Sequence, residues 1–176
     1  MKRIGLISAM LLLCLTALAQ QPASDVSFDS LKFLLGRWVG EGSSEVGDGS
    51  GYFSFETALQ GKAMVRKNHA EYPATKERPA YAHDDLMIVY VDLGTKRLCG
   101  FYTDNEGHVI NYAISISSDR KSVVFLSEAQ AASPRYRLTY TVMQPDKMAI
   151  TLEVAAPGKP DQFQKIVEGR VRKSSS

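Results

Sequence analysis

Short runs rich in β-branched and aromatic residues alternate apolar with polar positions along most of this chain. Turn-forming residues interrupt these runs roughly every 8–12 positions. In the run 108–117, for example, His108, Ile110 and Tyr112 fall on one face. A period of two is the spacing of a strand, whose side chains point alternately to opposite faces. The expected strands are 36–45, 50–59, 62–72, 84–92, 97–104, 108–117, 121–128, 135–144, 147–155 and 163–172.

The connections between these strands decide the architecture. Most are short turns, such as the glycine-rich 47–51 and Asp104 to Gly107, and only 73–83 and 156–162 are longer. Consecutive strands with short links predict an all-β protein, an antiparallel up-and-down β-barrel of about ten strands, because closure leaves no strand edge exposed. A two-sheet sandwich is the alternative. One helical turn over 31–35 is expected before the first strand, capped by Asp29 or Ser30.

The first nineteen residues have the pattern of a signal peptide. Lys2 and Arg3 give a positive start, an apolar run follows over 4–15, and Ala17 and Ala19 are small residues at the positions that a signal peptidase reads. The apolar run falls short of the ~20 residues that a membrane-spanning helix needs. We therefore expect cleavage before Gln20 and a protein exported to the periplasm or to the exterior of the cell.

The expected organisation after cleavage is simple. A flexible leader over 20–30 precedes a single barrel domain over 31–173, and a short tail covers 174–176. No later run is long enough to be a transmembrane segment. Cys14 would leave with the signal peptide, so Cys99 would be alone and no intramolecular disulfide is expected.

Charge excludes one class of partner. The chain has 21 basic and 19 acidic residues, and removal of Lys2 and Arg3 leaves the two signs balanced. A neutral chain without a basic block does not fit a nucleic-acid-binding protein. We expect no nucleic-acid partner.

The segment 33–42, with Gly36-Arg37-Trp38, resembles the opening of the lipocalin-like barrels known as calycins, which include lipocalins, fatty-acid-binding proteins and nitrobindins. Their first strand begins with Gly-x-Trp. The segments 83–90 and 101–110 resemble a group of uncharacterised exported bacterial proteins of this barrel type, which has no assigned activity. Fatty-acid-binding proteins insert two helices where this chain has only 47–51. Nitrobindin-like proteins hold haem through a C-terminal histidine, and this chain has no histidine after His108, so no cofactor is expected.

The resemblance implies which end of the barrel is closed. Trp38 would lie at the closed end, and the last strand would bring Arg170 and Arg172 toward it, where an arginine over the indole forms a cation–π pair. The polar residues gather at the other, open end. They are His69, Tyr72, Tyr81, His83, Asp84, Asp85, Tyr102, Asp104, His108, Arg135, Tyr136 and Arg137.

Several of these residues have alternative interpretations. His69, Glu71, His83, Asp84 and His108 could gather as metal ligands, but the sequence has no closely spaced histidine motif, so no metal is expected. An acid–base pair of His108 with Asp104 or Glu106 is conceivable, but turn carboxylates usually only cap hairpins. Arg135 and Arg137 could anchor a ligand carboxylate, although their alternation with aromatic residues favours an outward orientation.

We expect the barrel to bind a small apolar or amphipathic molecule in its interior. Its apolar strand faces should point inward, carrying His108 and Tyr112 into one shared cavity. One alternative is an enzyme that uses the same region, for which we assign no catalytic residue, and another is a filled barrel with a structural or interaction role. The residues expected to bind the ligand are His69, Tyr90, Tyr102, His108 and Tyr112.

Overall fold

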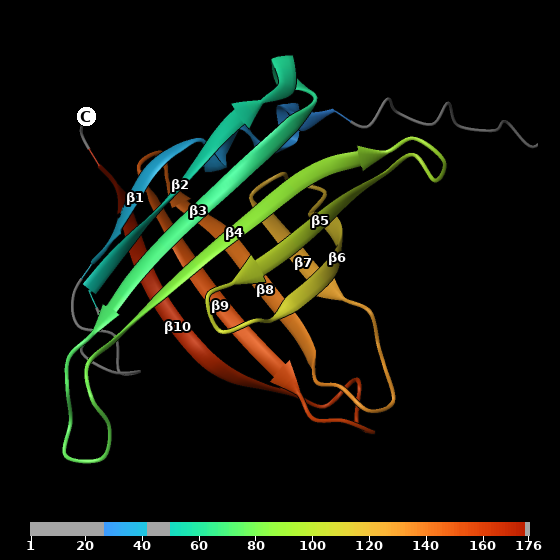
Figure 1. Cartoon of the computed structure of the whole chain (residues 1–176). Coiled ribbons are helices and arrows are strands. Elements are labelled where there is room, and N and C mark those ends of the chain that lie inside the picture. Colours follow the sequence, from blue (N-terminus) through green and yellow to red (C-terminus); the bar gives the residue numbers. More distant parts are fainter. Residues whose placement is uncertain (1–26, 42–49, 175–176) are drawn as a thin grey trace, which may run out of the picture.

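The computed structural model describes residues 27–41 and 50–174, and within these ranges the chain forms a closed antiparallel β-barrel (Figure 1). Its strands are β1 (Gly36–Gly40), β2 (Ser50–Ala58), β3 (Ala63–Tyr72), β4 (Tyr81–Asp92), β5 (Arg97–Asp104), β6 (Val109–Ile116), β7 (Ser122–Ser127), β8 (Arg135–Gln144), β9 (Lys147–Ala155) and β10 (Phe163–Lys173). Short 3-10 helices are η1 (Phe28–Leu34) and η2 (Leu59–Gly61). The all-β barrel expected from the sequence is confirmed.

Each strand pairs with its neighbours in the chain, and β1 pairs with β10 to close the barrel. The closing register places Trp38 opposite Lys173 and Gly40 opposite Val171. Because the strands run up and down, η1 and the β2–β3 and β4–β5 connections lie at one end, shown uppermost in Figure 1. The β3–β4, β5–β6, β7–β8 and β9–β10 connections lie at the other end, which we call the mouth.

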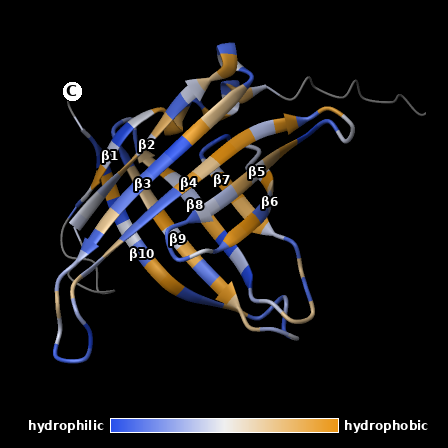
Figure 2. Ribbon diagram, in the orientation of Figure 1, coloured by the Kyte–Doolittle hydropathy of each residue, from blue (hydrophilic) through white to orange (hydrophobic). Residues whose placement is uncertain are grey.

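The alternation of apolar and polar residues directs the packing. Figure 2 shows hydrophobic and hydrophilic positions alternating along the strands of the barrel. In β7 the buried Val123 and Phe125 alternate with partly exposed neighbours, as the period of two requires. Apolar side chains from opposite sides of the barrel therefore meet in its interior.

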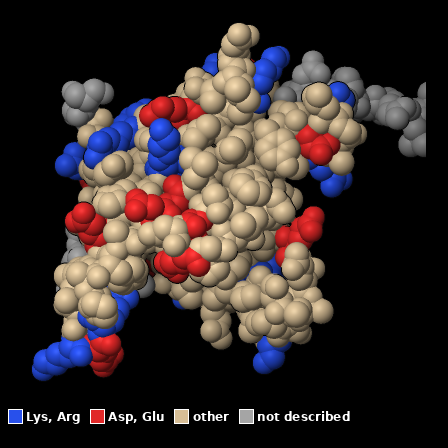
Figure 3. Space-filling view, in the orientation of Figure 1, with Lys and Arg blue, Asp and Glu red and all other residues tan. Residues whose placement is uncertain are grey.

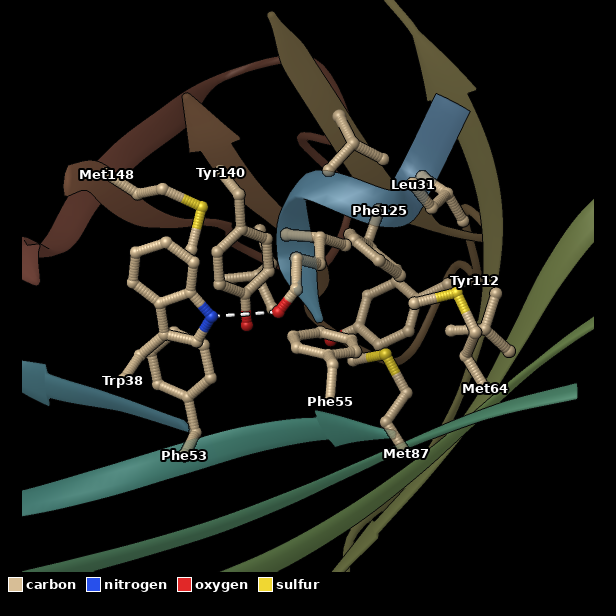
Figure 4. Close-up of a cluster of buried hydrophobic side chains, with 14 of the residues drawn as sticks. Leu31, Trp38, Phe53, Phe55, Met64, Met87, Tyr112, Phe125, Tyr140 and Met148 are labelled. Atoms are coloured by element: carbon tan, nitrogen blue, oxygen red, sulfur yellow. Dashed lines mark hydrogen bonds between the residues drawn. The ribbon is translucent and has the colours of Figure 1, made fainter. Parts of the chain in front are cut away.

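The end of the barrel next to η1 is filled by apolar side chains (Figure 4). Leu31 and Leu34 of η1 are completely buried. The indole Nε1 of Trp38 donates a hydrogen bond of 2.8 Å to the Leu34 carbonyl and joins η1 to the first strand. In the same cluster Phe55 and Phe125 each pack edge-to-face on Tyr140, with ring centroids 5.7 and 5.9 Å from the Tyr140 ring. We call this the closed end.

The N-cap of the first helical turn is not the residue that the sequence predicted. The helical turn begins at Phe28, and the hydroxyl of Ser27 accepts the backbone N–H of Asp29 at 2.9 Å. Ser27 is therefore the cap in place of Asp29 or Ser30.

Strand β4 begins earlier than expected, at Tyr81. Tyr81 pairs with Tyr72 of β3, and the centroids of their stacked rings lie 4.6 Å apart.

The cation over the Trp38 indole is Lys173, whose Nζ lies 5.5 Å from the ring centroid. The sequence placed Arg170 and Arg172 there, and this detail is wrong. Val171 is buried in the interior, so its neighbours Arg170 and Arg172 point outward, whereas Lys173 returns to the inner face. An offset of one residue exchanges the two faces.

The expected signal peptide and most of the expected leader lie outside the described residues, as does Cys14. Phe28, Asp29 and Ser30, assigned to the leader by the sequence, belong to η1. Cys99 has a free thiol. No helix in the described part of the chain is long and apolar enough to cross a membrane.

Candidate functional site

The mouth half of the barrel interior is hollow. A cavity of about 480 Å³ extends from Trp38 and Phe53 toward the mouth. Its lining includes Glu106 and His108, whose side chains are half exposed, so the cavity reaches solvent at the mouth. A volume of this size fits one small organic molecule.

The two sides of this cavity differ in chemistry. Strands β8, β9 and β10 contribute an apolar wall, made of Leu138, Ile150, Leu152, Val167 and Val171. Strands β3 to β6 and their turn contribute a polar wall, made of Arg66, His83, Asp85, Tyr102, Asp104, Glu106 and His108. Acidic side chains also gather at the surface over the mouth ends of β3 and β4 and over the β5–β6 turn (Figure 3). An apolar wall facing a polar one is the lining that an amphipathic molecule requires.

The deepest charged pair of the polar wall joins neighbouring strands. Arg66 of β3 donates from Nη1 to Oδ1 of Asp85 on β4, and their side chains are only 10% and 4% exposed. The guanidinium carbon of Arg66 lies 5.4 Å from the ring centroid of Phe53. Burial raises the pKa of Asp85, although the charges of Arg66 and His83 oppose this.

His83 connects this pair to the rim. Its Nδ1 lies 2.9 Å from Oε1 of Glu106, and its Nε2 lies 3.4 Å from Oδ2 of Asp85. The hydroxyl of Tyr102 is 3.3 Å from the same Nε2. His83 and Asp85 are two residues apart on β4, so both point to the inner face.

Asp104 organises the β5–β6 turn. Its Oδ1 accepts the backbone N–H groups of Glu106 and His108 at 3.0 and 2.9 Å, and Gly107 provides the positive φ of +90° that the turn requires. Its Oδ2 lies 2.8 Å from Nδ1 of His108 and accepts the hydroxyl of Tyr102 at 3.0 Å. Burial alone would raise the pKa of Asp104, but these hydrogen bonds outweigh it and lower the pKa.

Three buried tyrosines keep their protons, two that line the cavity and Tyr140 in the closed end. Burial is the main cause that raises the pKa of Tyr102, Tyr112 and Tyr140. The hydroxyl of Tyr140 and the Nε of Arg66 are both buried without a hydrogen-bond partner in the described part of the chain. Tyr112 lines the cavity with 5% of its surface exposed, and its hydroxyl has no hydrogen bond to any described residue. Of these groups, the Tyr112 hydroxyl and the Arg66 guanidinium belong to residues that line the cavity, whereas Tyr140 lies in the closed end and interacts with Arg66.

Three of the residues expected from sequence to bind a ligand lie together. His108, Tyr112 and Tyr102 all line the cavity, and Tyr102 packs edge-to-face on Tyr112 at 6.4 Å. Strand β6 therefore has the inward face that its alternation predicted, with Ile110 between His108 and Tyr112.

The other two expected residues point away. Tyr90 lies on the outer surface with 38% of its surface exposed, because Val89 takes the inner position. His69 borders the cavity, but its ring is held outside by Asp84 at 2.7 Å and Glu71 at 3.2 Å. Hydrogen bonds to Asp84 and Glu71 raise the pKa of His69.

Arg135 and Arg137 also lie on the outer face. Arg137 forms a two-pronged ion pair with Glu153, with distances of 2.6 and 2.7 Å, and its guanidinium lies over the Phe163 ring. Arg135 pairs with Asp161 at 3.1 Å. They are therefore not the anchor for a ligand inside the barrel.

The residues weighed as metal ligands are divided between two faces. His69, Glu71 and Asp84 lie outside, and His83 and His108 lie inside. Over residues 27–41 and 50–174 no three histidine, cysteine or acidic side chains come together in a way that could hold a metal ion. The arrangement can instead bind polar groups and move protons along hydrogen bonds.

Arg66 was not identified from the sequence, and Asp85 was expected only as one of the polar residues of the open end. Each stands between apolar residues on an alternating strand, Arg66 after Met64 and Asp85 before Met87. Met64 and Met87 are buried, so the same alternation places Arg66 and Asp85 inside. The sequence feature that could have revealed this pair is the presence of two opposite charges on the core faces of adjacent strands.

Comparison with known proteins does not assign the chain to a group. No protein-family model matches the sequence, and a search of curated proteins finds no similar one. The closed ten-strand antiparallel barrel is consistent with a lipocalin-like or calycin-like fold.

Proposed function

We propose that this protein binds one small apolar or amphipathic molecule inside its barrel. The observation that carries the proposal is the cavity of about 480 Å³, which has an apolar wall on one side and a hydrogen-bonding wall on the other. A filled structural barrel would have side chains in this space. Contact between this apolar wall and a ligand favours binding by roughly 25 cal/mol for each Å² of apolar surface that is removed from water.

Binding of the neutral fluorescent probe N-phenyl-1-naphthylamine tests the proposal. We expect the wild-type protein to bind one probe with enhanced fluorescence. Leu152→Trp should abolish this binding, because Leu152 lines the cavity and an indole there fills it. The matched control is Leu93→Trp, at a side chain that is 76% exposed near the closed end. Equal probe binding by both variants would place the probe elsewhere and refute the proposal.

A second function is acid–base catalysis in the same cavity. It is favoured by the pairing of His108 with the buried carboxylate of Asp104, which is 2% exposed. A carboxylate on Nδ1 orients the imidazole so that Nε2 is free to take a proton. A base of this kind should remove the C–H proton of 5-nitrobenzisoxazole, which breaks the N–O bond and releases a coloured nitrophenolate. His108→Ala should abolish that reaction, whereas His69→Ala on the outer face should not. Equal rates in both variants would exclude His108.

The proposal also covers the cellular location of the protein and its family. The basic, apolar and small-residue pattern over 1–19 supports export to the periplasm or exterior, and the Gly-x-Trp start of the first strand supports a place among lipocalin-like barrels. Intact mass of the exported protein tests the first of these. A mature chain beginning at Gln20 is expected, and a retained Met1 or a lipidated Cys14 would contradict it.

A further inference from the structure

The polar wall of the cavity has a charge pattern that the proposed function leaves unexplained. It carries one arginine, Arg66, and three carboxylates, Asp85, Asp104 and Glu106. Asp85 already compensates Arg66 through the buried ion pair. The remaining carboxylates face the cavity and its rim, where Glu106 is 48% exposed. A ligand carboxylate that entered would lose its hydration and meet like charges.

The deep part of the cavity offers donors that have no acceptor. The Tyr112 side chain is 95% buried against the cavity, and none of the described residues accepts a hydrogen bond from its hydroxyl. Arg66, 8% exposed, uses Nη1 for Asp85, and its Nε makes no hydrogen bond in the described part of the chain, although the guanidinium also interacts with Tyr140. Because burial raises the pKa of Tyr112, its hydroxyl stays protonated and can donate. Unsatisfied buried donors are costly, and an acceptor on a ligand would remove that cost.

We propose, on the basis of the ligand-binding function above, that the cavity selects an uncharged molecule that places a carbonyl or similar neutral oxygen against Tyr112 and Arg66. Its apolar body lies along Ile150 and Leu152 on the opposite wall. The neutral oxygen satisfies the free donors without adding a negative charge beside Asp85 and Asp104. An alkyl ammonium ion is disfavoured at this depth, even though the rim is acidic, because it has no acceptor for Tyr112 or Arg66 and its charge would lie beside the guanidinium.

The test is displacement of N-phenyl-1-naphthylamine by three molecules of one chain length: decan-2-one, decanoate and decylamine, at pH 7.5. We expect decan-2-one to displace the probe at a concentration at least about tenfold lower than decanoate or decylamine. A ranking with decanoate or decylamine first, or equal displacement by all three, overturns the inference. Such a ranking would leave the proposed function standing, since probe binding and its loss in Leu152→Trp are measured separately.

Single-atom variants locate the polar contact. Tyr112→Phe removes one hydroxyl and should weaken the binding of decan-2-one about three- to tenfold, after correction for the probe affinity measured in the same variant. Tyr90→Phe is the matched control, because Tyr90 lies on the outer face, and it should change neither affinity. Equal decan-2-one affinity in Tyr112→Phe and wild type would contradict the assigned contact.

A second pair of variants tests how far the rim carboxylate disfavours an anionic ligand. Glu106→Gln removes a rim carboxylate and should narrow the difference between decan-2-one and decanoate by about threefold or more, because like-charge repulsion falls. Glu56→Gln on the exposed part of β2, toward the closed end, should leave the difference intact. If Glu106→Gln does not improve decanoate binding, the rim charge has no part in the selection.

Discussion

The two ends of this barrel enclose opposite kinds of side chain. At the closed end Leu31, Leu34 and Phe55 pack with almost no exposed surface. At the mouth Arg66, Asp85 and Asp104 line a cavity of about 480 Å³. The same alternating strands build both ends. The difference teaches that alternation determines which face points inward, while the inward side chains decide whether that space is packed or hollow.

The closed end should be the more sensitive to truncation. Trp38→Ala removes a side chain that is 1% exposed, its hydrogen bond to Leu34 and its contact with Lys173. We expect a loss of about 3–5 kcal/mol in the free energy of unfolding, measured by urea denaturation. A variant that melts within a degree or two of wild type would show that Trp38 does not support the closed end.

The mouth should be sensitive for an electrostatic reason. Asp85→Ala leaves Arg66 buried without its carboxylate and should cost about 3 kcal/mol. The paired variant Arg66→Met with Asp85→Leu removes both charges and should recover most of that stability, because no isolated charge remains. A double variant as unstable as Asp85→Ala would mean that packing, and not charge, explains the loss.

The β5–β6 turn should weaken in acid. Because hydrogen bonds hold the pKa of Asp104 below its ordinary 3.8, its carboxylate stabilises the fold above that pH and loses the contribution as pH falls through the folded value. Asp104→Asn should therefore cost about 1–3 kcal/mol at pH 7 and progressively less below about pH 3.8. A cost that does not change between pH 7 and pH 2 would rule out the charge as its source.

The outer face should show the smallest effect. Asp84 and Glu71 raise the pKa of His69 above its ordinary 6.5, so this pairing stabilises the fold below pH 6.5 and is lost as pH rises through the folded value. Titration of the His69 ring protons by NMR should show the raised pKa, and Asp84→Asn should lower it toward 6.5. An unchanged titration in that variant would mean that Asp84 does not hold the ring.

The sequence predicted the scaffold better than the chemistry of the cavity. The alternation in 108–117 placed Ile110 and Tyr112 inside, because a strand needs no distant information to set its faces. Arg66 was not identified, and Asp85 was not expected to pair with it, because charged residues usually lie at the surface and only the register of β3 on β4 brings these two together. The Lys173 contact was missed for a similar reason, since the faces of β10 depend on its pairing with β1.

The central claim is that a ligand enters the mouth half of the barrel, and NMR contacts between bound N-phenyl-1-naphthylamine and protein methyl groups test it most directly. The account predicts nuclear Overhauser contacts from the probe to Ile150, Leu152 and Val171, which share the apolar wall. Contacts to the outer residues Phe101 and Val109 instead, or the absence of any bound probe, would contradict it.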